Sequence, residues 1–220
     1  MSFFLNYSAE DYEYLLTPAG YVLLTLIMLL VLLSTHFIER KKTPKMSTKS
    51  LVYCSAAMAL ATVTSFIKFG SLPFGGSITL FSMFFVCFIG YLYGPTIGIT
   101  TGIAYGLLQL VVEPYIFHPL QVILDYPLAF GCLGLSGFFM SKKHGLAIGY
   151  VVAVIGRYLC HVVSGYLFFA EYAPENMNPF VYTLYYNATY LVPELILTLI
   201  LLFIPAVMKG LGQVKKMATE

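Results

Sequence analysis

The stretch EPYIFHPLQVILDYPLAF, residues 113–130, places ionisable and amide side chains between segments that otherwise consist of apolar residues. A carboxylate inside the hydrocarbon region of a membrane costs free energy and usually belongs to a binding or transport site. If the segment after His118 is a helix, His118, Gln121 and Asp125 are spaced i, i+3 and i+7 and share one face. The spacing therefore predicts a ligand-binding face around Asp125, with Glu113 just before it.

A second polar stripe is expected on the next long apolar segment, which contains GRYLCHVVSGYLFFAEYA. Tyr158, His161, Gly165 and Phe169 are spaced i, i+3, i+7 and i+11 along one helical face. The glycine leaves a gap in which a flat ligand can lie against the Phe169 ring. Arg157 neighbours this face and is expected to pair with a buried carboxylate or to form a structural ion pair. Buried histidine and tyrosine are also common packing residues, so a purely structural stripe stays open.

The sequence NPFVYTLYYNATYLVPEL supplies a third group of polar residues. Asn187, Tyr190 and Glu194 are spaced i, i+3 and i+7, and Tyr182 precedes them. An asparagine amide both donates and accepts hydrogen bonds, which suits the edge of a heteroaromatic ring. For Glu194, an ion pair with Arg157 and contact with a ligand are both open.

Motifs for several other chemistries are absent from the sequence. No GxxxxGK[ST] loop is present, so the chain is not expected to hydrolyse ATP itself. No HExxH or His/Cys cluster suggests zinc and no GxSxG elbow suggests a serine nucleophile, so we expect neither a metal nor a cofactor. The four cysteines stand singly in apolar runs, as small buried residues do. An enzyme that uses Asp125 and His161 stays open as an alternative.

The composition places these residues in a membrane. Of the 220 residues, 59% are hydrophobic and 10% are charged, which is too apolar for a soluble domain of this length. The apolar runs are roughly 17 to 25 residues long, which fits spanning helices and not the shorter strands of a barrel. We therefore predict an all-α membrane protein with helices at 19–38, 51–69, 79–93, 96–112, 119–140, 146–170 and 186–208.

The basic residues predict the orientation of these helices. They cluster at 40–49, 142–143 and 209–216. With seven spans the three clusters fall on one side, which the positive-inside rule makes the cytoplasmic side. The N-terminus is then outside and the C-terminus inside.

The outer side would carry acidic residues and almost no basic ones. Its loops, near 70–78, 112–118 and 171–185, contain no lysine or arginine. Only Lys68 lies near this side, at the end of its helix, where it is expected to reach the interface. An acidic, aromatic-rich vestibule favours cations, although insertion alone would produce the same charge pattern.

Small residues mark two helix surfaces that are expected to pack closely. Glycines at 90, 94, 98, 102 and 106 recur every four residues and predict a packing ridge. On the helix at 51–69, Ser55, Ala59 and neighbouring alanines form a similar face. It is expected to pack inside the bundle or to dock a separate membrane subunit.

Several of these segments, in their order, resemble the thiamine-specific substrate-binding (S) components of energy-coupling factor (ECF) vitamin transporters, the ThiT family. The resemblance rests on GGSITL (75–80), YGLLQL (105–110), the stretch 113–139, GRYLCHVVSGYLFFAEYA (156–173) and VYTLYYN (181–187). It implies a six-helix substrate-binding bundle over 50–208. Residues 1–49 would add an outer N-terminal segment, an accessory transmembrane helix and a basic linker, and 209–220 a cytoplasmic tail.

The resemblance also implies a function and partners. The chain would capture thiamine with high affinity at the outer face of a bacterial plasma membrane, with the 70–78 loop as an outer gate, and would not be an enzyme. Transport would require a separate transmembrane coupling (T) subunit, docked on the Ser55 and Ala59 face, and two ATP-binding cassette ATPases. Besides thiamine, these subunits and the lipid bilayer, no partner is expected, and in particular no nucleic acid.

Ligand-facing positions follow from the family's motifs. Carried over residue by residue, they are Tyr115, Asp125, Tyr126, His161, Gly165, Phe169, Tyr182 and Asn187. Further pocket positions expected from spacing are Glu113, Gln121, Tyr158 and Glu194.

Each ligand-facing residue has an implied role. Asp125 would accept from the aminopyrimidine or balance the cationic thiazolium, Asn187 and Tyr182 would read the ring edge, and His161 would bond between the rings. Phe169 would stack on the pyrimidine, and the two tyrosines at 115 and 126 would enclose the thiazolium by cation–π contact.

The chain departs from the family pattern at two of these positions. The family often has glutamate where this chain has Asp125, and tryptophan where it has Phe169 and near Gly76. The present sequence contains no tryptophan. Alternatives are an S component for hydroxymethylpyrimidine or riboflavin, the membrane enzyme named above, and a purely structural membrane subunit.

Overall fold

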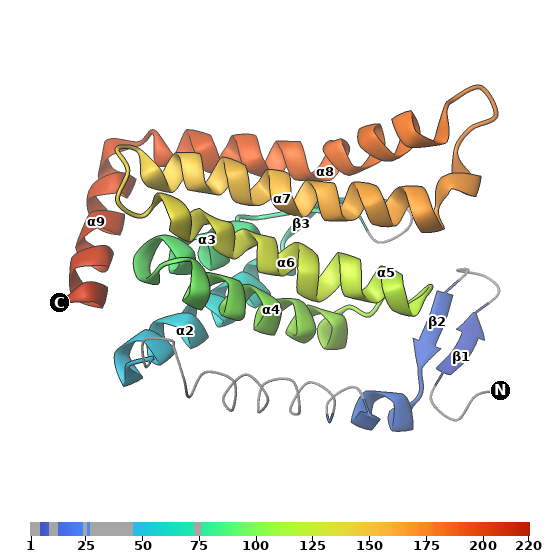
Figure 1. Ribbon diagram of the computed structural model, residues 1–220, viewed down its shortest axis with the longest axis horizontal. Coiled ribbons are helices and arrows are strands. Elements are labelled where there is room, and N and C mark those ends of the chain that lie inside the picture. The colour runs from blue at the N-terminus through green and yellow to red at the C-terminus, as the bar shows by residue number, and fades with distance from the viewer. Residues whose placement is uncertain (1–4, 9–12, 24–25, 27–45, 73–75) are drawn as a thin grey trace.

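The computed structural model describes residues 5–8, 13–23, 26, 46–72 and 76–220. These residues are mainly helical, as predicted, and their helices lie side by side in an elongated bundle (Figure 1). The helices are α2 (Thr48–Ser65), α3 (Ser82–Tyr93), α4 (Pro95–Val112), α7 (Gly145–Phe168), α8 (Pro179–Leu202) and α9 (Pro205–Thr219). Between α4 and α7 the helical turns α5 (Pro119–Ile123), η3 (Leu124–Leu128), α6 (Ala129–Gly131) and η4 (Cys132–Phe139) follow one another directly.

Within the part of the chain that the structure describes, four helical segments are long and apolar enough to cross a membrane. They are α4, the segment Pro119–Phe139, α7 and α8, and α3 is a shorter apolar helix. The protein is therefore a multi-pass membrane protein. Of the predicted first span, 19–38, most lies outside the described residues, although 18–23 and 26 are helical. The count of seven spans stays a prediction.

The glycine ridge packs helix against helix, as its spacing predicted. A Cβ atom on Gly98 would lie 2.5 Å from the Cα of Gly90, and one on Gly102 would lie 2.2 Å from the carbonyl oxygen of Phe130. Any side chain at these positions would push α4 away from α3 and from the 119–139 segment. The close approach brings the segment that carries Asp125 against the rest of the bundle.

Helix α8 begins at Pro179, seven residues before the predicted start at 186. Asn178 caps the helix, because its side-chain oxygen accepts from the backbone N–H groups of Phe180 and Val181. Pro179 at the first helical position needs no hydrogen-bond partner for its nitrogen. The earlier start brings Tyr182 and Thr183 onto the same helix as Asn187.

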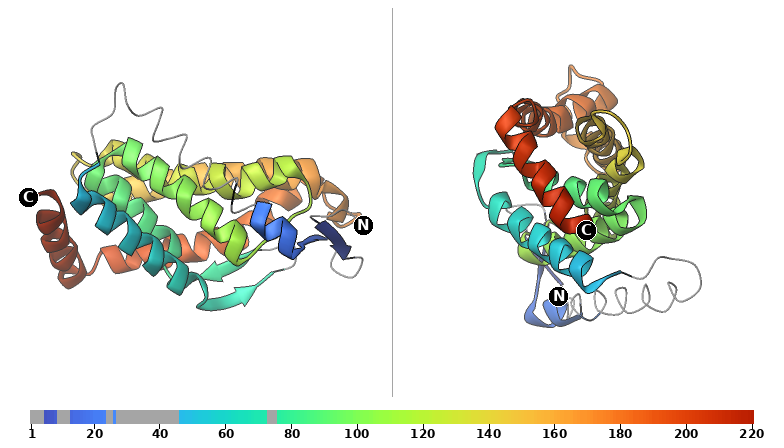
Figure 2. Two further views of the ribbon diagram at one scale, coloured as in Figure 1. Left: turned by 90° about the horizontal axis from the view of Figure 1, so that it is seen from below. Right: turned by 90° about the vertical axis from the view of Figure 1, so that its left-hand side faces the viewer.

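The segment 209–220, predicted as a cytoplasmic tail, forms most of helix α9, and its cytoplasmic location stays a prediction. α9 lies across one end of the bundle (Figures 1 and 2). Leu211 and Val214 pack on the core, and Ala218 is buried. Lysines interrupt the apolar run of this segment, so a search for apolar runs did not detect its amphipathic period.

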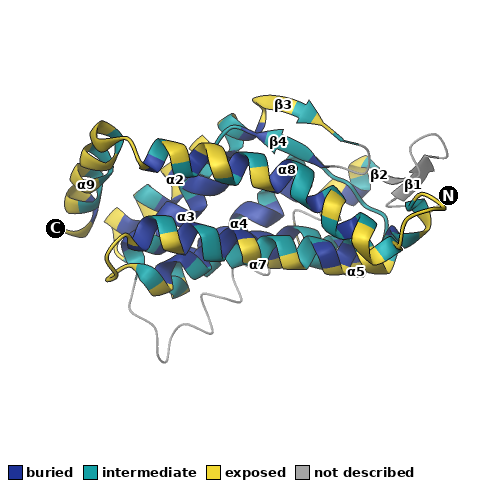
Figure 3. Ribbon diagram, turned by 90° about the horizontal axis from the view of Figure 1, so that it is seen from above, coloured by how far each residue is buried: buried dark blue, intermediate teal, exposed yellow. Residues whose placement is uncertain are grey.

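The two ends of the bundle differ in charge. The start of α2, the turn at 141–144 and α9 lie at one end, and the 113–118 loop lies at the other (Figure 1). Lys215 links two of the basic segments, because its ammonium donates to the carbonyl oxygen of Met140 and lies 4.0 Å from the Tyr91 ring centroid. Figure 3 shows that buried faces point inward along the bundle, while exposed residues follow its outside.

The segment predicted as an outer loop at 70–78 contains part of a β-hairpin. Strand β3 (Lys68–Ser71) pairs antiparallel with β4 (Ser77–Thr79), and residues 73–75 lie outside the described part of the chain. A second hairpin joins β1 (Leu5–Ser8) and β2 (Glu13–Leu16). Lys68 is therefore a strand residue, and the prediction that it ends a helix was wrong.

Candidate binding pocket

A cavity lies among α3, α4, the 119–131 segment, α7 and α8. Its volume is about 150 Å³, which is room for on the order of ten water molecules and so for a small organic ligand. Of the predicted positions, it is lined by Glu113, Tyr115, Gln121, Asp125, Tyr126, His161, Gly165, Phe169, Tyr182, Asn187 and Glu194. The three sequence groups, far apart along the chain, therefore meet in one cavity.

The segment that carries Asp125 is an irregular helix. In η3 the N–H of Ala129 bonds to the carbonyl oxygen of Leu124, five residues back, and Pro127 sits inside this π-helical turn. Proline has no N–H, so the ordinary hydrogen-bond ladder cannot pass through it unchanged. Such turns widen a helix and re-aim its side chains, and they are frequent at functional sites.

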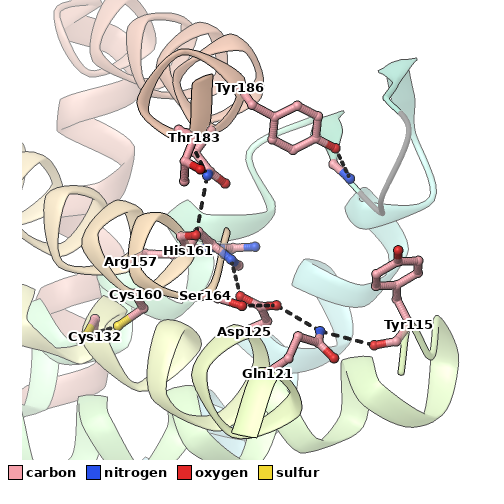
Figure 4. A network of polar contacts seen from close by, with 12 residues as sticks. Tyr115, Gln121, Asp125, Cys132, Arg157, Cys160, His161, Ser164, Thr183 and Tyr186 are labelled. Carbon is pink, nitrogen blue, oxygen red and sulfur yellow. Dashed lines mark hydrogen bonds and ion pairs between the residues drawn. The ribbon is translucent and has the colours of Figure 1, made fainter. Parts of the chain in front are cut away.

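The Asp125 carboxylate receives three hydrogen bonds from side chains on two segments (Figure 4). Oδ2 accepts from Gln121 Nε2 at 2.8 Å and from Ser164 Oγ at 2.9 Å, and Oδ1 lies 2.9 Å from His161 Nδ1. An ionised carboxylate offers about four accepting positions. Among the described residues, one position on Oδ1 therefore has no donor, and Asp125 lines the cavity.

His161 is held from both sides of its ring. Arg157 Nε donates to His161 Nε2 at 3.2 Å, so Nε2 acts as the acceptor and Nδ1 carries the hydrogen that points to Asp125. The guanidinium carbon of Arg157 also lies 4.0 Å from the Phe130 ring centroid. Both ring nitrogens of His161 therefore already have protein partners.

Aromatic rings surround one part of the cavity. The Phe169 ring lies 6.0 Å from the Tyr115 ring and 5.2 Å from the Phe117 ring, between centroids. Gly165 lies one turn before Phe169 and faces α8, since a Cβ there would be 2.6 Å from Thr183 Cγ2. The missing side chain lets α7 and α8 approach closely beside the aromatic rings.

On α8, Asn187 is fixed by its neighbours. Its Nδ2 donates to the carbonyl oxygens of Thr183, at 2.9 Å, and His161, at 3.4 Å, and its Oδ1 accepts from Tyr190 Oη at 2.6 Å. These bonds assign which end of the amide is nitrogen. Tyr186 connects α8 to the residue before strand β4, because its hydroxyl accepts from the N–H of Gly76 at 3.3 Å (Figure 4).

Glu194 is a buried carboxylate with a structural set of donors. Thr79 Oγ1 donates to it at 2.6 Å, the N–H of Met83 at 3.0 Å, and Ser82 Oγ at 3.4 Å. The first turn of α3 has no side-chain cap of its own, so Glu194 caps it from α8. Arg157 does not form the ion pair with Glu194 that the sequence left open.

The 113–118 loop closes the cavity near the aromatic rings. Tyr126 holds it, since its hydroxyl donates to the carbonyl oxygen of Glu113 at 2.9 Å and accepts from the N–H of Tyr115 at 2.8 Å. The Glu113 carboxylate pairs with Lys68 Nζ at 2.7 Å, which joins the loop to β3. Both side chains are part-exposed. Their opposite charges offset each other at the rim of the cavity, and an exposed pair of this kind contributes little to stability.

Two residues that helical spacing placed on a candidate binding face lie outside the cavity. Tyr158 does not line the cavity, and its hydroxyl instead donates to the carbonyl oxygen of Leu184, between α7 and α8. His118 is exposed, and it precedes α5 as a cap whose Nδ1 accepts from the N–H of Leu120. Helical spacing could not place His118, because the residue lies outside the helix.

Several lining residues were not singled out from the sequence. Ser164 could have been found, because it lies three residues after His161 on the same face. Spacing could also have pointed to Tyr105 and Gln109, which are i and i+4 on α4, and to Thr183, four residues before Asn187 on α8. Other lining residues have no such signal: Ser65, Thr79, Ser82, Met83 and Tyr186. In the described part of the chain, no three acidic, histidine or cysteine side chains are grouped as a metal site would require.

Comparisons with known proteins connect this pocket to a family. Residues 51–211 match the model of a family described as thiamine transporter protein (Thia_YuaJ). The chain belongs to the thiamine transporter family. The matched range contains every residue that lines the cavity.

Individual members of the thiamine transporter family support the same assignment. Over 165 residues, 69% of this chain and 84% of the relative, the chain is 36% identical to the thiamine transporter ThiT of Bacillus subtilis. It is 29% identical over 116 residues to ThiT of Lacticaseibacillus paracasei, which covers 45% of this chain and 58% of that one.

A solved structure of ThiT from Listeria monocytogenes shares the fold, with a TM-score of 0.58 and 25% identity over 72% of this chain and 96% of that one. The resemblance to ThiT S components, the helical fold and the assignment to transport instead of catalysis are thereby confirmed.

Proposed function

We propose that this chain is the thiamine-binding S component of an ECF-type transporter, which captures thiamine from outside the cell and delivers it with separate coupling subunits. The family assignment supports thiamine as the substrate. The observation that carries the assignment of the site is the Asp125 carboxylate, which lines the cavity and accepts from three donors of the described residues, fewer than the four positions that it offers.

The charges of the cavity suit a cationic ligand. Its lining includes three carboxylates, Glu113, Asp125 and Glu194, and one guanidinium, Arg157. Lys68 balances Glu113 at the rim. With all three carboxylates counted as ionised, one formal negative charge is left for the single positive charge of a thiazolium ring.

The shape and polarity of the cavity suit the rings of thiamine. The aminopyrimidine would stack on Phe169 and donate its amino hydrogen to Asp125, and Asn187 and Tyr182 would border the ring edge. Tyr115, which lies beside Phe169, would face the thiazolium through its ring. Tyr126 would contribute its ring only, because its hydroxyl is committed to the 113–118 loop.

A face on α2 fits the coupling subunit. Ser55 and Ala59 are exposed, and Val52 and Val63, each 60% exposed, continue the same side of the helix. Small exposed residues on a membrane helix allow another helix to approach closely. Together with two ATPases, a T subunit docked here would supply the energy coupling that this chain does not encode.

The same proposal includes an orientation. The basic end, with the turn at 141–144 and α9, would face the cytoplasm of a bacterial cell, and the 113–118 loop would face outward. The hairpin formed by β3 and β4, tied to Glu113 through Lys68, would then border the outer entrance.

Equilibrium binding of thiamine to the purified full chain tests the proposal. Saturable one-to-one binding is expected, and competition by hydroxymethylpyrimidine or riboflavin should be weaker than by unlabelled thiamine. Asn187→Ala should weaken binding, because it removes the amide that lies between His161 and Tyr190. A folded parent protein without measurable thiamine binding would refute the assignment.

A further inference from the structure

Arg157 is a charged residue of the pocket that thiamine binding as proposed above does not use. Its Nε donates to His161 Nε2, and its guanidinium lies over the Phe130 ring. Within the described residues no carboxylate oxygen lies within ion-pair distance of it. A cation without a paired carboxylate is unexpected in a pocket for a cation, because it repels the ligand.

The hydrogen bonds define what Arg157 does. An arginine can only donate, so His161 Nε2 must offer a lone pair to Arg157 Nε at 3.2 Å. The ring hydrogen is then on Nδ1, 2.9 Å from Asp125 Oδ1. The bonds run in one direction, from Arg157 through the imidazole to Asp125.

A second proton on His161 would change the pocket. It would have to occupy Nε2, where the Nε–H of Arg157 already points. The other groups packed on His161 carry no formal charge: the Tyr190 ring lies 6.1 Å away between centroids, and the Asn187 amide contacts the backbone oxygen. An imidazolium would pair with Asp125 and leave less of the carboxylate's charge for the ligand.

We infer that Arg157 is a positioning residue that holds His161 as a neutral imidazole protonated at Nδ1, so that the charge of Asp125 is kept for a cationic ligand. The inference rests on the proposed thiamine site. It predicts an unusual sign: removing a positive charge from this pocket should weaken the binding of a cation.

The binding test compares three variants of the full chain. Arg157→Met removes both charge and donor at similar length and should weaken thiamine binding about five- to tenfold, as a charge-assisted hydrogen bond becomes an ordinary one. Arg157→Lys keeps a charged donor and should stay within about threefold of the parent. Lys142→Met, the matched control, removes a positive charge from the exposed turn at 141–144, away from His161, and should leave binding unchanged.

A spectroscopic test reads the imidazole directly. The chain has four histidines, so ¹⁵N-histidine labelling gives few signals, and His161→Asn identifies the one that belongs to His161. One protonated and one bare ring nitrogen are expected in the parent, and two protonated nitrogens in Arg157→Met. In a His161→Asn background, Arg157→Met should no longer weaken thiamine binding.

Two results would overturn the inference. One is a doubly protonated His161 in the parent protein, and the other is an Arg157→Met variant that binds thiamine as tightly as the parent or more tightly. Failure of the proposed function can be distinguished from failure of this inference. In that case the parent protein would not bind thiamine, but the nitrogen signals of His161 would still report its contact with Arg157.

Discussion

The open accepting position on Asp125 predicts that the pocket distinguishes an amino group from an oxygen on the ligand. Its other three positions are filled by Gln121, Ser164 and His161, all donors at 2.8 to 2.9 Å. Oxythiamine carries oxygen where thiamine has its pyrimidine amino group, so it would place an acceptor against a carboxylate. We therefore expect the parent protein to prefer thiamine strongly.

The magnitude follows from the bond that is lost. A hydrogen bond to a charged group contributes about 1.5 to 3 kcal/mol, so the parent should bind oxythiamine roughly 10- to 150-fold more weakly than thiamine. In Asp125→Asn, the amide nitrogen must face one of the three donors, which leaves a donor unpaired. Together with the lost charge this costs about 2 to 4 kcal/mol, or roughly 30- to 700-fold in thiamine affinity.

The same variant should change the preference. An asparagine amide can donate to the oxygen of oxythiamine. The affinities of this variant for thiamine and for oxythiamine should therefore differ by less than about threefold. Isothermal titration calorimetry with both ligands measures this, and thermal unfolding confirms that each variant is folded. Glu113→Gln is the matched control, because Glu113 is part-exposed and paired with Lys68, and its effect should stay below about fivefold.

Two results would refute this reasoning. A parent protein that binds oxythiamine as tightly as thiamine would show that Asp125 does not read the amino group. An Asp125→Asn variant that keeps the parent's preference would place the discrimination on another residue.

Three further predictions follow from the packing around the pocket. Phe169→Leu should lower thiamine affinity about three- to tenfold, because an aromatic pair contributes about 0.5 to 1.5 kcal/mol beyond the burial of apolar surface. Phe169→Trp should keep or raise the affinity, and calorimetry measures both variants. Gly165→Ala should lower the midpoint of thermal unfolding and the affinity together, since its Cβ would lie 2.6 Å from Thr183 Cγ2; an unchanged midpoint would contradict the close approach of α7 and α8. Ala59→Leu should leave thiamine binding by the isolated chain unchanged but reduce uptake in cells that hold the coupling subunits, and Val163→Leu, on an exposed part of α7, serves as its control.

The sequence patterns located most of the pocket because they report faces of regular helices. Asn187, Tyr190 and Glu194 were placed on one face by their spacing, and all three line the cavity. The same argument failed for His118, which precedes its helix, and for Tyr158, whose hydroxyl bonds to α8. Periodicity holds only within an element and does not say which neighbour that element meets.

Short and irregular elements were the least predictable parts of the fold. Pro127 is the one sequence signal for the π-helical turn around Asp125. In α9, lysines interrupt the apolar residues, so the segment does not stand out as an apolar run. The hairpin of β3 and β4 is only a few residues long, so a loop was the natural expectation. Such elements are stabilised mainly by contacts with the rest of the molecule, which a local pattern does not contain.

By itself, the sequence determined that this protein lies in a membrane and that it is helical. It also identified the polar side chains whose burial in lipid costs enough free energy to mark them as candidate functional residues. Those properties depend on composition and on spacing along the chain, and both are local. Only the tertiary structure decided that Arg157 bonds to His161 and not to Glu194, that Glu194 caps α3, and that Asp125 keeps one accepting position. Except for Arg157 and His161, which are neighbours on α7, the partners lie tens of residues apart, and the close packing of the helices at glycine contacts brings them together.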